Sequence, residues 1–217
     1  MTRNPYNGCV GEKLAEVRRI LDRYLVEVVE AYDLCPWARS ARNGGEVAVE
    51  ILWGEPAVDA WARAAEAALA HPETRVAMVV APETTLSPAE LRRVRDRVGA
   101  RIPGVGVAHF HPDAALDLAS PARLVPFLRR SPDPLLQLVP LALLDSVRGA
   151  PSAARLVQQV QMLLGTAAPP RGDVADRIAA VNHTRVSAEV DAIVQCLDQI
   201  AADRRAAYAR AGIRSSR

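Results

Sequence analysis

Three short apolar segments, separated by two helical patterns, constrain the fold of this chain more than any other feature. Residues 46–53 alternate with the period of a strand, and residues 75–82 and 104–111 are apolar runs of strand length. Strands that alternate with helices of ten or more residues predict an α/β fold, in which helices pack on a parallel or mixed sheet. We expect three or four strands, and an α+β arrangement stays open.

One helix start and one further apolar segment can be placed on specific residues. Ser87, Pro88 and Glu90 form the pattern of a capping box with proline at the first helical position. Residues 135–147 are strongly apolar, and their pattern fits a fourth strand that continues into a helix. Residues 112–134 contain several prolines and predict a long structured loop, which in a compact domain is often functional.

Helical patterns also begin and end the chain. Residues 11–34 form an amphipathic helix, and residues 151–205 carry two apolar stripes that we expect to pack on the core. Residues 204–217 form a polar tail that we expect to fray. A single domain over residues 1–217, with an α/β core at residues 46–150, is the predicted organisation. The stripes consist of Leu156, Val160, Leu163 and Leu164, and of Val190, Ile193, Val194, Leu197 and Ile200.

Composition and charge argue against several classes of protein. The net charge is only +2, Lys13 is the sole lysine, and no basic block is dense enough to track a phosphate backbone. The first residues lack the apolar segment of a secretory signal, and no apolar run reaches the ~18 to 20 residues that cross a bilayer. Cys9, Cys35 and Cys196 are widely spaced, which favours reduced thiols. We expect a cytoplasmic protein with a small-molecule ligand and neither nucleic acid nor membrane as partner; a homo-oligomer stays open.

A cysteine lies directly before a proline in the stretch Asp33–Ala38, DLCPWA. Three roles stay open for Cys35: a packing residue, a reactive thiol, and a ligand of a metal or of haem, which Cys-Pro segments can bind through the thiolate. Its position after a helix C-terminus favours an inert thiol, because the negative end of the helix dipole raises a thiol pKa. Arg39 and Arg42 favour the opposite, because nearby cations would stabilise a thiolate.

Two histidines end the third predicted strand. His109 and His111 are two residues apart, so both side chains point to one face of the sheet, where they could bind a metal or supply a general base. Their position supports a site, because ligands of open α/β sheets bind beyond the carboxyl ends of the strands. The alternative is a strand end with two hydrogen-bonded histidines.

The stretch Arg129–Pro134, RRSPDP, combines two arginines, a hydroxyl group and a stiff turn with two prolines. Guanidinium groups bind carboxylate or phosphate through two parallel hydrogen bonds. This composition suggests an anion site at Arg129 and Arg130, with an ordinary solvated turn as the alternative.

Taken together, LCPWA, FHPD and RRSPDPLLQL resemble, in order and separation, the signature of an uncharacterised bacterial family, the DUF1415 family. The resemblance covers about residues 25–148. Asn182 resembles a further asparagine in the C-terminal part of that family. The residues that match the signature are Leu34, Cys35, Pro36, Ala38, Phe110, His111, Pro112, Asp113, Arg130, Ser131, Pro132, Pro134 and Leu138.

The chain also departs from the family pattern. Leu128 and Arg129 replace a polar lead-in, and Asp133 stands where tyrosine is usual. Gln137 stands in place of a second motif histidine, and the acidic residue that follows in the family is missing, with Leu141 nearby. If that histidine and acid perform acid–base chemistry in the relatives, this chain has lost or relocated it.

The resemblance implies that Cys35, His111 and Arg130 converge in one site, because a polar residue at a fixed place in three separate loops rarely serves packing. We expect an enzyme acting on a small anionic metabolite, with Cys35 as nucleophile or metal ligand, His111 as general base or ligand, and Arg130 as anion clamp. The alternatives are a protein that binds haem or a divalent metal through Cys35 with His111 or His109, and a non-catalytic binding module. The other residues expected around the substrate are Arg129, Ser131, Asp113, Gln137, Trp37 and Asn182.

Overall fold

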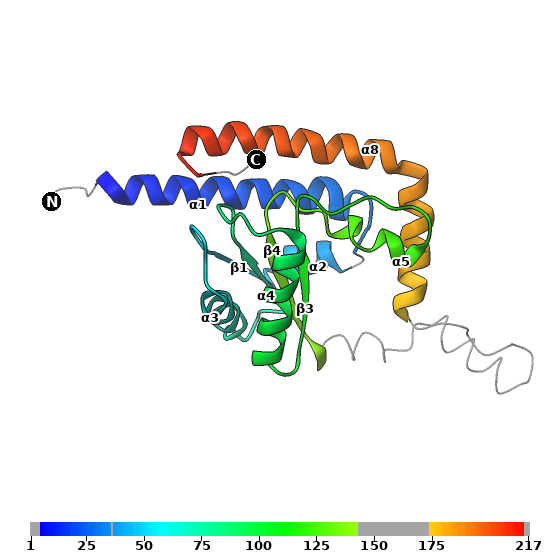
Figure 1. Cartoon of the computed structure of the whole chain (residues 1–217), viewed down its shortest axis with the longest axis horizontal. Coiled ribbons are helices and arrows are strands. Elements are labelled where there is room, and N and C mark those ends of the chain that lie inside the picture. Colours follow the sequence, from blue (N-terminus) through cyan, green and yellow to red (C-terminus); the bar gives the residue numbers. More distant parts are fainter. Residues whose placement is uncertain (1–4, 36, 143–173, 215–217) are drawn as a thin grey trace, which may run out of the picture.

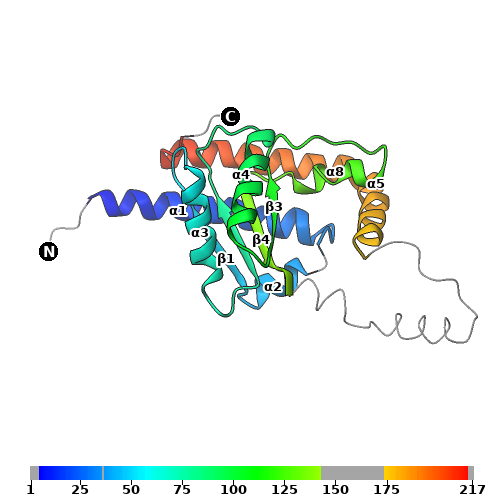
Figure 2. The same cartoon turned by 60° about the horizontal axis from the view of Figure 1, so that its bottom comes forward.

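A four-stranded sheet with the order β1-β2-β4-β3 forms the centre of the molecule (Figure 1). The structure, a computed structural model, describes residues 5–35, 37–142 and 174–214. β1 and β2 run parallel, and β4 is antiparallel to both of its neighbours. Helices cover both faces, as the two views in Figures 1 and 2 show, so the predicted α/β fold with a mixed sheet is confirmed. The strands are β1 (Val47–Ile51), β2 (Val76–Val80), β3 (Val105–Phe110) and β4 (Leu135–Pro140).

The first part of segment 135–147 is a strand, and it lies between β2 and β3 rather than at an edge. Gln137 pairs with Met78 on one side and with Ala108 on the other, so its side chain lies in the middle of the sheet. The strand ends at Pro140, opposite Val105, where a missing backbone donor costs little because the ladder stops there.

One face of the sheet packs against α3 (Val58–Leu69) and α4 (Pro88–Arg101). The predicted capping box at the start of α4 is confirmed: the Glu90 backbone N–H donates to Ser87 Oγ over 3.3 Å, and the Ser87 N–H donates to a Glu90 carboxylate oxygen over 2.8 Å. The apolar residues that alternate toward these helices pack into one cluster. From the strands it contains Ala77, Val79, Leu136 and Leu138, with Val105 and Val107 at its margin.

The other face is covered by α1 (Pro5–Tyr24), the π-helix η1 (Leu25–Glu30) and α8 (Val174–Ala211). α1 and α8 lie side by side across the sheet, and α8 bends at Glu189, where the backbone leaves helical values (φ −123, ψ 15) (Figure 1). The helix predicted over residues 11–34 thus begins earlier and ends before Asp33. Its buried side chains share one core with α8 and the sheet, including Val17, Ile20, Tyr24, Met78, Val80, Leu135, Ile193, Leu197 and Ile200.

The end of the chain differs from the prediction. The first C-terminal stripe, at residues 156–164, lies outside the described residues, whereas Ile193, Leu197 and Ile200 of the second stripe are buried on α8. The expectation that residues 204–217 fray is wrong for residues 204–213, because Tyr208 and Ile213 are buried in the core. Across the described ranges, no helix combines the length and the hydropathy that a membrane crossing requires.

Candidate functional site

A mostly apolar cavity of about 470 Å³ lies between the sheet and the helices that lead to Cys35. This volume is within the range of about 300 to 1,000 Å³ that is typical of pockets for small organic molecules. The strands contribute Met78 and Gln137, and the cavity is closed by α1, η1, α2 (Ala38–Asn43) and residues 125–129. The apolar lining includes Leu21, Leu25, Val29, Leu34, Ala38, Val47, Val76, Phe110, Leu128, Leu135 and Val139. We call this space the Cys35 cavity.

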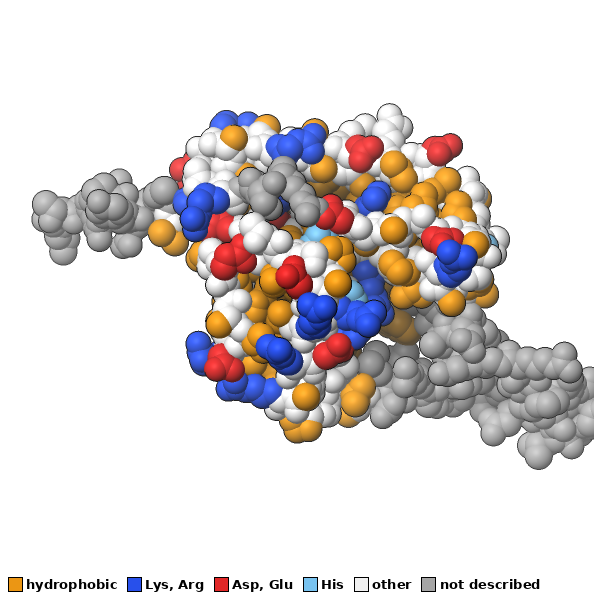
Figure 3. Space-filling model, in the orientation of Figure 1, with side chains coloured by type: hydrophobic (Ala, Val, Ile, Leu, Met, Phe, Trp, Pro, Cys, Tyr) orange, Lys and Arg blue, Asp and Glu red, His pale blue; other side chains and the backbone are white. Residues whose placement is uncertain are grey.

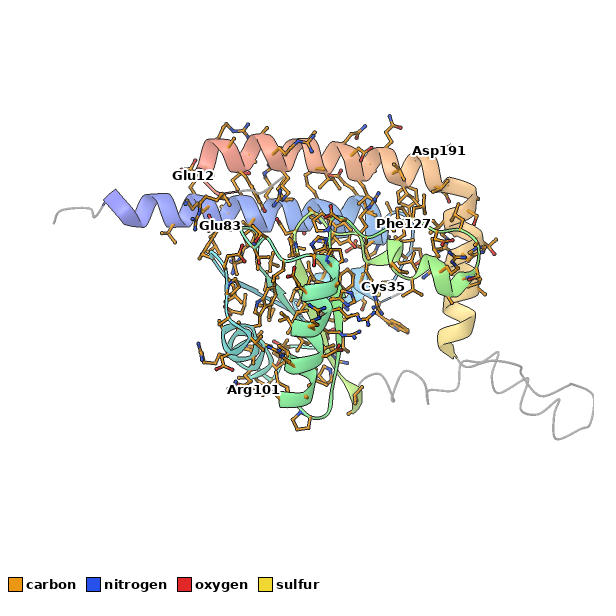
Figure 4. All side chains as sticks on the ribbon, in the orientation of Figure 1. Glu12, Cys35, Glu83, Arg101, Phe127 and Asp191 are labelled. Atoms are coloured by element: carbon orange, nitrogen blue, oxygen red, sulfur yellow. The ribbon has the colours of Figure 1, made fainter. Side chains whose placement is uncertain are left out.

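Cys35, labelled in Figure 4, lines this cavity and follows a tight turn to which two side chains of α8 donate hydrogen bonds. Asp33 adopts a left-handed backbone conformation (φ 48), which an aspartate tolerates better than most residues. Asn182 donates from Nδ2 to the Leu34 carbonyl oxygen over 3.1 Å. Arg185 donates to the Asp33 carbonyl oxygen over 2.8 Å and to its carboxylate over 2.9 Å. Asn182, expected to contact substrate, therefore orients the turn that carries the thiol.

The Cys35 thiol is protonated at neutral pH. Burial raises its pKa, and the Asp33 carboxylate acts in the same direction, while the backbone N–H groups of Trp37 and Ala38 act against them. The expectation that Arg39 and Arg42 stabilise a thiolate is corrected, because both pair with a buried carboxylate instead. The distances to the Glu30 carboxylate are 2.6 Å from Arg42 Nε and 3.6 Å from Arg39 Nε.

The polar side chains of Gln137 and Arg129 lie at this cavity without a hydrogen-bond or ion-pair partner among the described residues. The Gln137 amide faces the cavity from the middle of the sheet, and none of the described residues hydrogen bonds to it. Arg129, at the end of the short 3-10 helix η2 (Phe127–Arg129), forms no ion pair or side-chain hydrogen bond with any described residue. Trp37, 41% exposed, also lines the cavity. Three of the expected substrate-binding residues therefore do surround one space.

His111 has a structural role that sequence reasoning kept only as an alternative. Its Nε2 lies 2.8 Å from the Leu86 carbonyl oxygen, which can only accept, so Nε2 carries the proton. Its Nδ1 accepts a hydrogen bond of 3.0 Å from the Asp113 backbone N–H. Both ring nitrogens are thus engaged, and the ring is 4% exposed. The geometry does not support His111 as general base or metal ligand. The backbone N–H of Asp113 helps to fix the orientation of the His111 ring.

Cys35 and His111 line different cavities, so the expectation of one shared cleft is corrected. His111 borders a second space of about 230 Å³ with Thr84, Asp113 and Arg204, and no residue belongs to both linings. The physical reason is topological: Cys35 packs on the face covered by α1 and α8, whereas His111 follows β3 and binds the loop that precedes α4.

The expected metal ligands are not brought together. His109 shares the strand face of Val105 and Val107, toward α4, and its Nδ1 is buried without a hydrogen-bond partner among the described residues. Cys35 lies on the opposite side of the sheet. Within residues 5–35, 37–142 and 174–214, no three His, Cys, Asp or Glu side chains are grouped so that they could hold a metal ion.

The Arg-Ser-Pro turn is held by internal hydrogen bonds. Arg130 donates from Nε to the Ala114 carbonyl oxygen over 3.0 Å and lies 5.4 Å from the Phe127 ring centre, and it does not line the Cys35 cavity. The buried Ser131 hydroxyl donates to the Asp133 carbonyl oxygen over 2.5 Å. Arg130 and Ser131 are therefore structural here, contrary to their expected roles as anion clamp and substrate contact.

Sequence reasoning missed two sets of residues. Tyr24 and Ser40 line the Cys35 cavity, but a helical pattern assigns Tyr24 to the core and gives Ser40 no distinction. Asp133 is buried and accepts hydrogen bonds from Arg204 Nε over 2.7 Å and from the Tyr208 hydroxyl over 2.6 Å. The signal for the second set was Asp133 itself, a carboxylate in a stretch where the resemblance to the DUF1415 family predicts tyrosine, because a buried carboxylate requires a polar partner elsewhere in the chain.

The chain matches no family model, no curated protein and no solved structure. The resemblance to the DUF1415 family therefore stays a prediction.

Proposed function

We propose that this protein binds a small, mostly apolar organic molecule in the Cys35 cavity. The observation that carries the proposal is a cavity of ligand size whose apolar lining is interrupted by the Gln137 amide, to which no described residue hydrogen bonds. An amide in apolar surroundings loses its hydrogen bonds to water, so it favours a ligand that returns them. The rigid turn around Cys35 supports a preformed site, because Asn182 and Arg185 fix its backbone.

Binding has more support than catalysis by a Cys35–His111 pair. A nucleophilic thiol needs a lowered pKa or an adjacent base, and here burial raises the thiol pKa while His111 lines another cavity. A haem or metal site has less support as well, because the described residues that line the Cys35 cavity include no histidine.

A titration with N-phenylnaphthylamine, a neutral apolar dye that fluoresces in dry surroundings, tests the proposal. We expect saturable binding of one dye per chain. Ala38→Phe fills part of the cavity and should weaken binding at least tenfold. Ala67→Phe makes the same change at an exposed position of α3 and should leave the affinity unchanged. Absence of saturable binding, or equal affinities for the wild type and Ala38→Phe, would overturn the proposal.

A further inference from the structure

Three arginines line the Cys35 cavity, and they differ in how their charge is balanced. Arg42 pairs with Glu30 over 2.6 Å, and Arg75 pairs with Glu46 over 2.9 Å. Arg129 has no carboxylate or hydrogen-bond acceptor among the described residues. Of the three guanidinium groups at the cavity, that of Arg129 is therefore the one whose charge no described residue neutralises.

Burial and a neighbouring cation disfavour the charged form of Arg129. Burial lowers its pKa, and the charge of Arg95 on α4 acts in the same direction. His109 has a pKa lowered to about 4, first by burial and then by Arg95, Arg129 and Arg92. The carboxylate near this group, Asp96, already pairs with Arg95 over 2.9 Å. Figure 3 shows that basic side chains gather over α4 on the face of the molecule drawn there. Among the described residues that act on Arg129 and His109, the one carboxylate is thus already paired, which leaves a net positive charge at this end of the cavity.

We propose that the molecule bound in the Cys35 cavity is an amphipathic anion. Its acidic group pairs with the Arg129 guanidinium, while its apolar body fills the part of the cavity that Gln137 lines. This inference rests on the proposed function and names the class of its ligand. Carboxylates, sulfonates and phosphate esters all fit, because each presents two oxygens to the two parallel N–H donors of a guanidinium. A partly buried arginine without a partner among the described residues favours such a group over a neutral ligand of the same shape.

Two dyes that differ in one acidic group provide the test. N-phenylnaphthylamine is neutral, and anilinonaphthalenesulfonate adds a sulfonate to the same ring system. The quantity measured is the ratio of their dissociation constants, which removes changes that affect both dyes equally. Arg129→Gln should shift this ratio about tenfold against the sulfonate, whereas Arg129→Lys should retain most of the preference because it keeps the charge. Arg130→Gln changes the adjacent arginine, which does not line the cavity, and should leave the ratio as in the wild type.

The outcomes separate the two proposals. If the wild type does not bind N-phenylnaphthylamine, the proposed function fails. If it binds this dye but Arg129→Gln leaves the ratio unchanged, or if Arg130→Gln shifts it instead, only the anionic class is overturned. Should Arg129→Gln fail to fold, the salt dependence of binding to the wild type tests the inference. Raising the KCl concentration should weaken binding of anilinonaphthalenesulfonate and leave binding of N-phenylnaphthylamine constant. Equal salt dependence of the two dyes would overturn the inference.

Discussion

Replacing Asp133 with asparagine should destabilise the fold strongly, although the change is nearly isosteric. The Asp133 side chain is 1% exposed, and that of Arg204, its partner over 2.7 Å, is 9% exposed. Arg204 also donates to the Pro82 carbonyl oxygen over 3.1 Å, and Tyr208 donates to the second carboxylate oxygen over 2.6 Å. Removing the negative charge leaves the guanidinium buried beside a neutral amide. Loss of one member of a buried ion pair typically costs about 3 to 5 kcal/mol, and we expect about 3 kcal/mol because the amide oxygen can still accept.

Urea unfolding followed by circular dichroism measures this cost as a lower midpoint at an unchanged slope. In a chain of this size, 3 kcal/mol corresponds to roughly 6 to 12 °C in melting temperature. Asp198→Asn makes the same change at an exposed position of α8 and should alter stability by less than about 0.5 kcal/mol. A loss below about 1 kcal/mol for Asp133→Asn would refute the reasoning, because the buried charge of Arg204 would then be satisfied without this carboxylate.

Three other substitutions test the account of the site. Asn182→Ala removes the hydrogen bond to the Leu34 carbonyl oxygen and should speed alkylation of Cys35 by iodoacetamide several-fold. His183→Ala removes a hydrogen bond to the Leu118 carbonyl oxygen instead and should leave the alkylation rate of Cys35 unchanged. His111→Ala should lower the unfolding free energy by about 2 kcal/mol in urea, because it removes a ring that is 4% exposed together with its hydrogen bonds to Leu86 and Asp113. It should leave dye binding in the Cys35 cavity unchanged. The pKa of His109 is about 4 in the fold against an ordinary 6.5, so its contribution to stability is present above pH 6.5 and is lost as the pH falls toward 4. His109→Gln should flatten that part of the pH–stability profile, by about 1 to 2 kcal/mol because solvent screens the partly exposed ring; an unchanged profile would contradict the assignment.

Local patterns predicted the elements well because their causes are local. The capping box at Ser87 and the strand at residues 75–82 depend on neighbouring residues alone, and both are present. The insertion of β4 between β2 and β3 depends on contacts between distant segments, so no periodicity within residues 135–147 could reveal it.

The site was only partly predictable for the same reason. The individual stretches around Cys35, His111 and Arg130 correctly mark ordered turns with buried or partly buried polar groups. Whether two such turns face one cavity depends on which side of the sheet each leaves, and sequence spacing does not carry that information. Gln137 was recognisable as a polar residue in an apolar strand, but only the structure places it in the Cys35 cavity.

Protection of Cys35 by a bound molecule tests the central claim most directly. Alkylation of each cysteine is followed by mass spectrometry, with and without saturating N-phenylnaphthylamine. Cys196, on α8 with its thiol 3.7 Å from the Glu27 carbonyl oxygen, lies outside the cavity and provides an internal control. The account predicts that the dye slows alkylation of Cys35 at least tenfold and leaves the rate of Cys196 unchanged. Saturable dye binding with no protection of Cys35, or with equal protection of both thiols, would contradict a ligand site at the Cys35 cavity.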